Sequence, residues 1–281
     1  MEISSKPIAA GRTAEIYAWE EGQILKLLRP GFPPGLIQQE EVITNAIYQA
    51  GIAAPKIYSL VEVNGRPGII YERIDGPSLI ALMERSPFRL REYAALLARL
   101  HAAVHTHTYP NAPEGTTRQK NVLARQVQEA QVLPEAVRAA VLRLLERLPD
   151  GDTLCHNDFH PLNVLIGTDE KGAYRPVIID WESASLGNAC ADVARTSLTI
   201  ALGRPPEGLP NLLRRITVEF YLRSFTSAYL DHYRSIAGDS LADLRAWQTV
   251  QAAAKVQYEA PANQGMWLEV IDKGLGSRKV A

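Results

Sequence analysis

Three side chains with hard oxygen atoms, Asp158, Asn163 and Asp180, have the types and spacing needed to handle a metal ion or a proton. Asp158 and Asn163 are five residues apart, and Asp180 follows two apolar runs that are separated by a polar turn. Because the runs are typical of a β-hairpin, we expect the residues at its open end to meet. Carboxylates and an amide gathered beside apolar strands cost stability, which favours a site that binds a cation or moves a proton.

Magnesium is the cation that suits these ligands. It prefers a few oxygen atoms from the protein and leaves other positions for phosphate oxygens and water. A zinc hydrolase is the alternative, because His156 and His160 flank Asp158. That alternative lacks a further set of histidine or cysteine ligands, so the pattern favours magnesium.

Phosphoryl transfer would use all of these groups. Asp180 would bridge Mg²⁺ to the β- and γ-phosphates, Asn163 would complete the metal site, and Asp158 would accept the proton of the attacking hydroxyl. Lys26 would neutralise the α- and β-phosphates, and Glu40 would hold that lysine in place.

The nucleotide side of this hypothesis rests on weaker patterns. Lys26 interrupts an apolar strand, which is also typical of an edge-strand lysine that reaches water. Glu40 lies early in a predicted helix, where the helix dipole alone explains an acid. Gly11 and Thr13 lie in a loop that could cover phosphates, although an ordinary hairpin turn explains a single glycine as well. The backbone of residues 72–74, with Glu72 and Ile74 at its ends, would face the adenine edge.

The elements that must position these residues divide into two groups. The first 74 residues predict strands at 16–19, 24–28, 56–63 and 68–72 and one helix at 36–50. Later periodicity predicts helices around the central hairpin, at 78–85, 90–105, 118–131, 134–148, 188–201, 209–234, 240–259 and 263–273. We therefore expect an α+β fold with two lobes. These are a small β-rich nucleotide-binding lobe, 1–74, and a larger helical lobe, 75–281, that carries the catalytic loop and the substrate site.

Three histidines, His101, His105 and His107, end one of these helices, and the first two are spaced as metal ligands can be. No carboxylate accompanies them in the sequence, so we interpret them as helix-end residues. Aromatic residues recur at every fourth position from Tyr221 to Tyr233, which is more typical of a core face than of a cofactor site.

Composition excludes few classes of protein. The 281 residues include 30 basic and 31 acidic side chains, so a nucleic-acid partner is not expected. No apolar run approaches the length that spans a membrane, and the N-terminus lacks the apolar core of a signal peptide. Two cysteines suit a reducing compartment, and we expect a cytoplasmic monomer or dimer.

The segments HNDFHPLN, 156–163, and VIIDWE, 177–182, resemble the catalytic and metal-binding segments of the aminoglycoside phosphotransferase and choline kinase-like family, which has a protein-kinase-like fold. The resemblance extends to Gly11, Lys26, Glu40, the inter-lobe segment YERIDG and LARLH at 97–101. It implies Asp158 as catalytic base, Asn163 and Asp180 as Mg²⁺ ligands, and Lys26 with Glu40 as the phosphate-binding pair.

Two further residues take structural roles from the same resemblance. It implies that Asp192 is a buried aspartate that braces the catalytic loop, and that His156 supports the loop architecture. The chain departs from the family where Asn157 replaces the usual glycine, and its phosphate loop has only Gly11.

The resemblance implies an ATP- and Mg²⁺-dependent kinase of small-molecule hydroxyl groups, with GTP not excluded as the donor. The acceptor is either an aminoglycoside, with antibiotic resistance as one outcome, or a metabolite such as choline, homoserine or a sugar. Residues 201–281 carry eight acidic and ten basic side chains, which gives no acidic excess for a polycationic antibiotic. Our candidates for substrate contacts are Trp181, Glu182, Tyr258, Glu259 and Trp267.

Two other functions remain as alternatives. A protein-kinase-like enzyme acting on macromolecules is disfavoured, because no activation segment is recognisable after Asp180. A nucleotide-binding protein without turnover is disfavoured, because all catalytic positions are filled.

Overall fold

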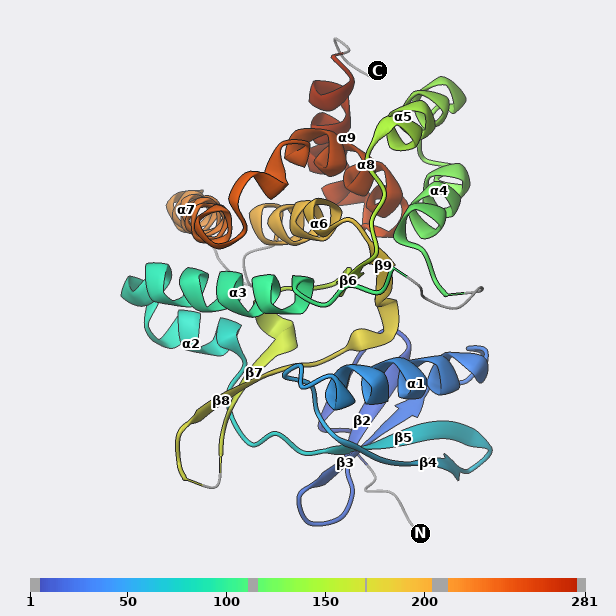
Figure 1. Cartoon of the computed structure of the whole chain (residues 1–281), viewed down its shortest axis with the longest axis vertical. Helices are drawn as coiled ribbons and strands as arrows, with labels where there is room; N and C mark the ends of the chain where they lie inside the picture. Colours follow the sequence, from blue (N-terminus) through green and yellow to red (C-terminus); the bar gives the residue numbers. More distant parts are fainter. Residues whose placement is uncertain (1–5, 111–115, 170, 204–211, 277–281) are drawn as a thin grey trace. The chain divides into compact units, whose positions relative to one another are not determined.

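The computed structural model (Figure 1) describes residues 6–110, 116–169, 171–203 and 212–276. The chain forms two compact units, and neither is continuous in sequence. The first contains residues 1–85 and 161–183, and the second contains residues 86–160 and 184–281. The chain therefore passes from one unit to the other inside the segment that carries Asp158 and Asn163.

A five-stranded antiparallel sheet forms the base of the first unit, in the order β1-β2-β3-β5-β4. The strands are β1 (Ala9–Ala10), β2 (Ala14–Ala18), β3 (Gln23–Leu28), β4 (Ile57–Val63) and β5 (Arg66–Glu72). Asn64 and Gly65 join β4 to β5 with φ angles of 54° and 73°, the left-handed conformation that a tight hairpin turn requires. Buried apolar side chains of β3 and β5, such as Leu25 and Ile69, form the core of this unit.

Helical and hairpin elements complete the first unit. Helix α1 (Gly35–Gln49) packs on β4 and β5, and α2 (Leu79–Arg85) packs on the turn η2 (Pro161–Asn163). Strands β7 (Val164–Thr168) and β8 (Tyr174–Ile178) pair as the predicted hairpin, which is followed by the turn η3 (Trp181–Ser183). Two backbone hydrogen bonds join this hairpin to the N-terminal part of the chain, from Ile166 N to Pro77 O at 2.9 Å and from Ile178 N to Ala53 O at 2.6 Å.

Helices dominate the second unit. They are α3 (Leu90–His105), α4 (Gln119–Glu129), α5 (Glu135–Arg147), α6 (Ala189–Ala201), α7 (Leu212–Ala237), α8 (Leu244–Lys255) and α9 (Pro261–Leu275). The 3-10 turns are η1 (Pro87–Arg89), η4 (Gly238–Leu241) and η5 (Val256–Tyr258). Two short strands, β6 (Thr153–Cys155) and β9 (Ser185–Gly187), pair antiparallel. In the sequence, β6 precedes and β9 follows residues 161–183, which belong to the first unit.

The observed elements confirm the predicted α+β class. The helix expected at 240–259 instead consists of η4, α8 and η5, and the expected start of the preceding helix, Leu209, lies outside the described residues. The alternation rules did not detect β1, β6 or β9, because strands of two or three residues are too short to show it. None of the helices in the described ranges is long and apolar enough to cross a membrane.

Candidate functional site

Lys26 is the centre of a charged group in the first unit. Its Nζ donates to Glu40 Oε1 at 2.7 Å and to Asp180 Oδ1 at 3.0 Å, although these residues are 14 and 154 positions away in the sequence. Glu182 Oε2 lies 3.6 Å from the same nitrogen atom. The structure thus brings together the lysine, the helix glutamate and the hairpin aspartate that the sequence singled out.

Lys26 remains a cation in this setting. Burial alone would lower the pKa of Lys26, but Glu40, Asp180 and Glu182 together hold it above its ordinary value. Glu40 is 4% exposed, and its Oε1 also accepts a hydrogen bond from the Tyr71 hydroxyl at 2.9 Å. The helix-dipole explanation is therefore insufficient for Glu40, because its carboxylate points into the core and not to solvent.

Asn163 and Asp180 lie at the same end of the β7–β8 hairpin. Val164 pairs with Ile178, and one step further Ile179 N donates to Asn163 O at 2.9 Å. Asp180 follows with a φ of 65°, a left-handed conformation that is uncommon for residues other than glycine. Strain of this kind is often found where a side chain must be held in a particular direction for function.

The glycine loop contacts the same group of acids. Gly11 N donates to Ala14 O at 2.9 Å, which closes the loop between β1 and β2. Thr13 Oγ1 donates to Glu182 Oε2 at 3.2 Å. Thr13 and Glu182, which the sequence placed in separate nucleotide and substrate groups, are therefore neighbours.

Glu72 is the last residue of β5, and Ile74 follows two residues later. The Glu72 carboxylate forms a two-pronged ion pair with Arg175 of β8, and Glu72 N donates to Lys56 O at 2.8 Å. Ile74 lies against β7, because a Cβ added to Gly167 would come within 3.0 Å of its Cγ2. The Glu72 side chain thus joins the hairpin to the sheet.

Asp158 lies in the second unit, where positive charges surround it. Its backbone N–H donates to His156 Nδ1 at 3.2 Å, and its Oδ2 lies 3.5 Å from His160 Nε2. Burial alone would raise the pKa of Asp158, but His160, Arg195 and Lys255 hold it well below its usual range. The carboxylate is therefore ionised at neutral pH.

Asn157 replaces the glycine of the resembled motif and keeps a glycine-like backbone. Its φ is 62°, and asparagine is one of the few residues that tolerate this region. Its side chain is also held: Nδ2 donates to Ser185 Oγ at 2.9 Å, and Oδ1 accepts from Gln119 Nε2 at 2.7 Å. The substitution therefore adds side-chain contacts that a glycine would lack.

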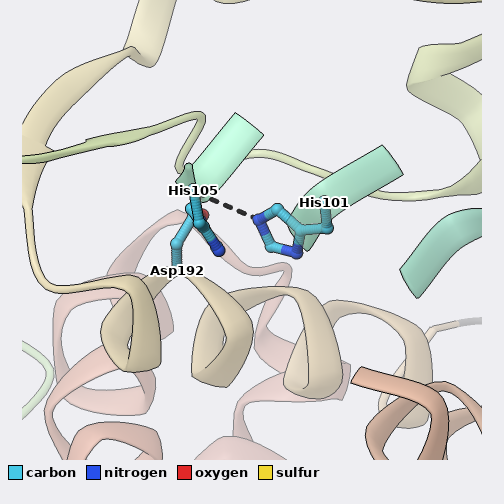
Figure 2. A group of neighbouring side chains, drawn as sticks. All are labelled: His101, His105 and Asp192. Carbon is cyan, nitrogen blue, oxygen red and sulfur yellow. Dashed lines mark hydrogen bonds and ion pairs between the residues drawn. The ribbon is translucent and has the colours of Figure 1, made fainter. Parts of the chain in front are cut away.

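Asp192 lies beside two histidines of α3, His101 and His105, as Figure 2 shows. Its carboxylate accepts hydrogen bonds from the backbone N–H groups of His156 at 2.6 Å and of Asn157 at 2.9 Å. The Nε2 atoms of His101 and His105 lie 3.1 and 3.3 Å from Asp192 Oδ2. On the far side of each ring, Nδ1 meets a tyrosine hydroxyl of α7 at 2.7 Å, Tyr229 for His101 and Tyr233 for His105.

The expectation that no carboxylate accompanies the histidines is therefore wrong, because folding brings Asp192 to them from 87 or more residues away. The residues next to the histidines in the sequence give no indication of this contact with Asp192. The group has the composition of a metal site, but both Asp192 oxygens already accept N–H groups of the loop. Burial lowers the pKa of His101 to about 4, so its ring is neutral. We interpret the group as a hydrogen-bonded brace.

Replacing Asp192 with asparagine should lower the free energy of unfolding by about 3 kcal/mol, because an amide NH₂ would face backbone donors in a fully buried place. Against the cost of burial, His101 and His105 hold the pKa of Asp192 well below its ordinary value of about 3.9. The ionised carboxylate therefore stabilises the wild type above that pH, and this contribution is lost on acidification. Urea unfolding between pH 7 and 3 should show that the free energy of unfolding falls less on acidification in Asp192→Asn than in the wild type.

The matched control is Asp231→Asn, because the Asp231 side chain on α7 is 70% exposed and pairs only at the surface. It should leave the free energy of unfolding within 0.5 kcal/mol of the wild type. Equal stability of Asp192→Asn and this control would contradict the brace.

The candidate substrate residues fall into two classes. Trp181 and Trp267 are buried, at 1% and 3% exposure, so we propose no substrate contact for them. Glu182 is partly exposed beside Lys26, whereas Tyr258 and Glu259 follow α8 in the second unit. Glu259 lies 3.9 Å from Lys255, one of the cations that act on Asp158.

Sequence reasoning missed Arg195, Lys255 and Gln119. Arg195 is one helical turn beyond Asp192, and no motif marks it. Gln119 Oε1 accepts from Asn188 N at 3.0 Å, so its side chain links Asn157 to the start of α6. Nothing in the sequence near residue 119 indicates such a contact.

Comparison with known proteins gives one family match. A family model described as "Phosphotransferase enzyme family" matches residues 4–238. A search of curated proteins found no match to the sequence.

Solved structures with a similar fold include a choline kinase, an aminoglycoside phosphotransferase and an amicoumacin kinase. Choline kinase LicA from Streptococcus pneumoniae has a TM-score of 0.64 and 17% identity, over 99% of this chain and 95% of its own. A thermostable mutant of aminoglycoside phosphotransferase APH(4)-Ia has a TM-score of 0.63 and 18% identity, over 98% and 96%. Amicoumacin kinase in complex with AMP-PNP, Ca²⁺ and its ligand has a TM-score of 0.60 and 14% identity, over 95% and 87%.

Proposed function

Because the chain belongs to the phosphotransferase enzyme family, we propose that it transfers the γ-phosphoryl group of ATP to a hydroxyl group of a small molecule. The observation that carries this proposal is the buried ammonium of Lys26 between Glu40 and Asp180. A lysine held in this way is a preorganised partner for nucleotide phosphates. The solved structures with a similar fold include kinases named for choline, an aminoglycoside and amicoumacin, which supports a small-molecule acceptor.

The first unit would bind the donor. Lys26 would contact the α- and β-phosphates, with Glu40 as its positioning partner. Gly11 and Thr13 would cover the phosphates, and the backbone between Glu72 and Ile74 would face the base. GTP is an alternative donor, because that backbone contact does not by itself distinguish the two bases.

Asn163 and Asp180 would hold Mg²⁺. Amide and carboxylate oxygens at one hairpin end are hard donors of the kind that this ion prefers, so the residues present fit it. When bound, the ion would neutralise charge on the β- and γ-phosphates. The complex of amicoumacin kinase with AMP-PNP and Ca²⁺ supports a divalent cation of this general kind.

Asp158 would act as the base. The acceptor oxygen forms a bond to the γ-phosphorus while the bond to the bridging oxygen breaks and ADP leaves with its electron pair. The proton of the acceptor hydroxyl passes to Asp158 Oδ. The lowered pKa of Asp158 keeps it able to take this proton, and the Asp192 brace would hold the backbone of the loop.

The proposal is tested by release of ADP from ATP and Mg²⁺ over a panel of aminoglycosides, macrolides, choline, homoserine and sugars. Stimulation by one class of compound, abolished in Asp158→Ala, would support both the reaction and the base. A protein that binds MgATP but releases ADP only at background would instead support a nucleotide-binding protein without turnover.

Replacing Asp180 with alanine should remove Mg²⁺-dependent nucleotide binding, because it deletes the carboxylate of the proposed metal site. Calorimetric titration with ATP, with and without Mg²⁺, measures this effect. We expect the wild type to bind at least tenfold more tightly with Mg²⁺ and the variant to show no such gain. An unchanged gain in the variant would rule out the metal role of Asp180.

The division into a nucleotide-binding lobe, 1–74, and a substrate lobe, 75–281, belongs to the same proposal. A cytoplasmic location and a monomeric or dimeric state also remain predictions.

A further inference from the structure

Two groups of residues contact the glycine loop, residues 11–13, which joins β1 to β2. The first group lies at the Thr13 hydroxyl, which donates to Glu182 Oε2 at 3.2 Å, and the same carboxylate oxygen lies 3.6 Å from Lys26 Nζ. The second group begins with Arg29, the residue that follows β3, whose backbone N–H donates to Thr13 O at 2.8 Å. The side chain of Thr13 thus belongs to the charged group around Lys26, whereas its carbonyl bonds to Arg29.

Arg29 holds the glycine loop by its side chain as well as by its backbone. Its Nε donates to Gly11 O at 3.0 Å, so the carbonyl groups at both ends of the loop bond to this one residue. Carbonyl oxygens carry partial negative charge and repel a phosphate, whereas backbone N–H groups and hydroxyls attract it. A residue that holds both carbonyl groups therefore limits the shapes in which the loop can meet a phosphate.

A carboxylate orients the guanidinium of Arg29. Arg29 Nη1 lies 3.5 Å from Glu15 Oε1, and Glu15 Oε2 accepts hydrogen bonds from Arg66 Nη2 at 2.7 Å and from the Tyr17 hydroxyl at 3.1 Å. Arg66 and Arg29 therefore share one acid. They differ in their other contact, because Arg66 Nε donates to Leu28 O of β3 at 2.8 Å, whereas Arg29 Nε donates to the glycine loop.

We propose that Arg29 is a positioning residue for the donor phosphates: by holding the Gly11 and Thr13 carbonyl groups, it keeps the glycine loop in the shape that covers the triphosphate beside Lys26. This inference rests on the proposed function, which places the loop over the phosphates. Arg29 acts on the triphosphate only through the loop. A loop that is already ordered binds its ligand more tightly, because the entropy of ordering it is not lost on binding.

Replacing Arg29 with methionine tests this role, because methionine keeps an unbranched side chain but has no donor for Gly11 O. The backbone bond to Thr13 would remain. We expect the Kd and the KM of MgATP to rise about tenfold, because the loop would no longer be held in position. The KM of the acceptor should stay within about twofold of the wild type. Calorimetric titration and steady-state ADP release measure these quantities. Arg29→Lys, which keeps the charge but not the planar fork, should recover part of the affinity.

The matched control is Arg66→Met, which removes the other guanidinium from Glu15 in the same compact unit. Urea unfolding should show at least as large a loss of stability as in Arg29→Met, because the Arg66 side chain is less exposed, at 23% against 36%. The Kd of MgATP should nevertheless stay within about twofold of the wild type, because Arg66 does not hold a loop carbonyl group.

Two further measurements separate the loop from the rest of the donor site. The Kd of Mg²⁺-tripolyphosphate, which has no base, should rise in Arg29→Met as much as that of MgATP, whereas adenosine, which has no phosphates, should bind the variant and the wild type alike. If Arg29 acts through the loop, the losses of MgATP affinity in Arg29→Met and Thr13→Val should add up to more than the loss in the double variant.

Each other result overturns the inference. An unchanged Kd of MgATP in Arg29→Met would show that the loop does not need the guanidinium. An equal loss in Arg66→Met, or an equal loss for adenosine, would show a general effect on the first unit. Fully additive losses in the double variant would show that Arg29 does not act through the loop. A wild type that does not bind MgATP would remove the proposed function itself, and this inference with it.

Discussion

Replacing Asp158 with asparagine should lower turnover by about 10²–10⁴-fold, the usual contribution of a general base. Asparagine keeps the size and polarity of the side chain but cannot accept the proton of the acceptor hydroxyl. Binding of MgATP should stay within threefold of the wild type, because the proposed donor residues lie in the other compact unit. Steady-state ADP release and calorimetric titration measure the two quantities.

The matched control for this variant is again Asp231→Asn, an exposed aspartate of the same unit. It should leave turnover unchanged. Turnover of Asp158→Asn within tenfold of the wild type would refute the base. A parallel loss of turnover and MgATP binding would instead indicate that the variant perturbs the fold.

Replacing Lys26 with methionine should both destabilise the protein and weaken nucleotide binding. The substitution leaves Glu40 buried without its cation, and breaking a buried ion pair in this way costs about 3–5 kcal/mol. The affinity for ATP should fall at least tenfold, because methionine cannot neutralise phosphate charge. Urea unfolding and calorimetric titration with MgATP separate the two effects. Lys56→Met, at an exposed lysine of the same unit, is the control.

The double variant Lys26→Met/Glu40→Gln separates stability from function. A glutamine at position 40 removes the buried charge and can still accept the Tyr71 hydroxyl hydrogen bond. We expect the double variant to be more stable than Lys26→Met by at least 1 kcal/mol. ATP affinity should not recover. Recovery of both quantities would show that Lys26 acts only through stability.

The local patterns of the sequence predicted the fold class, and the resemblance of two motif segments predicted the family. The β7–β8 hairpin, α3 and the change from strands to helices follow from turn residues and periodicity. The family match confirms the resemblance and the phosphotransferase class, and the solved structures share the two-lobed α+β fold. The structure brings Lys26, Glu40 and Asp180 into contact, but the roles of the site residues remain proposals.

Contacts between distant helices could not be predicted in the same way. Periodicity placed Tyr229 and Tyr233 on a core face, yet it gave no sign that their hydroxyls meet His101 and His105, both 128 residues away. The Nε of Arg195, which is buried without a hydrogen-bond partner among the described residues, likewise reflects packing, which a helical pattern does not show. Such pairings depend on how the helices pack against one another. The same apolar stripe is compatible with many different packing arrangements.

The discontinuous first unit has a consequence for folding during synthesis. Its sheet is complete once Glu72 has been made, but the hairpin that hydrogen-bonds to Ala53 and Pro77 is about a hundred residues away along the chain. Lys26 and Glu40 can therefore pair early, while Asp180 reaches them only after the α3–α5 segment has emerged from the ribosome. Pairing across such separations raises contact order and slows folding. A nascent chain that stops before residue 161 would thus hold the lysine and glutamate but neither proposed ligand of the metal.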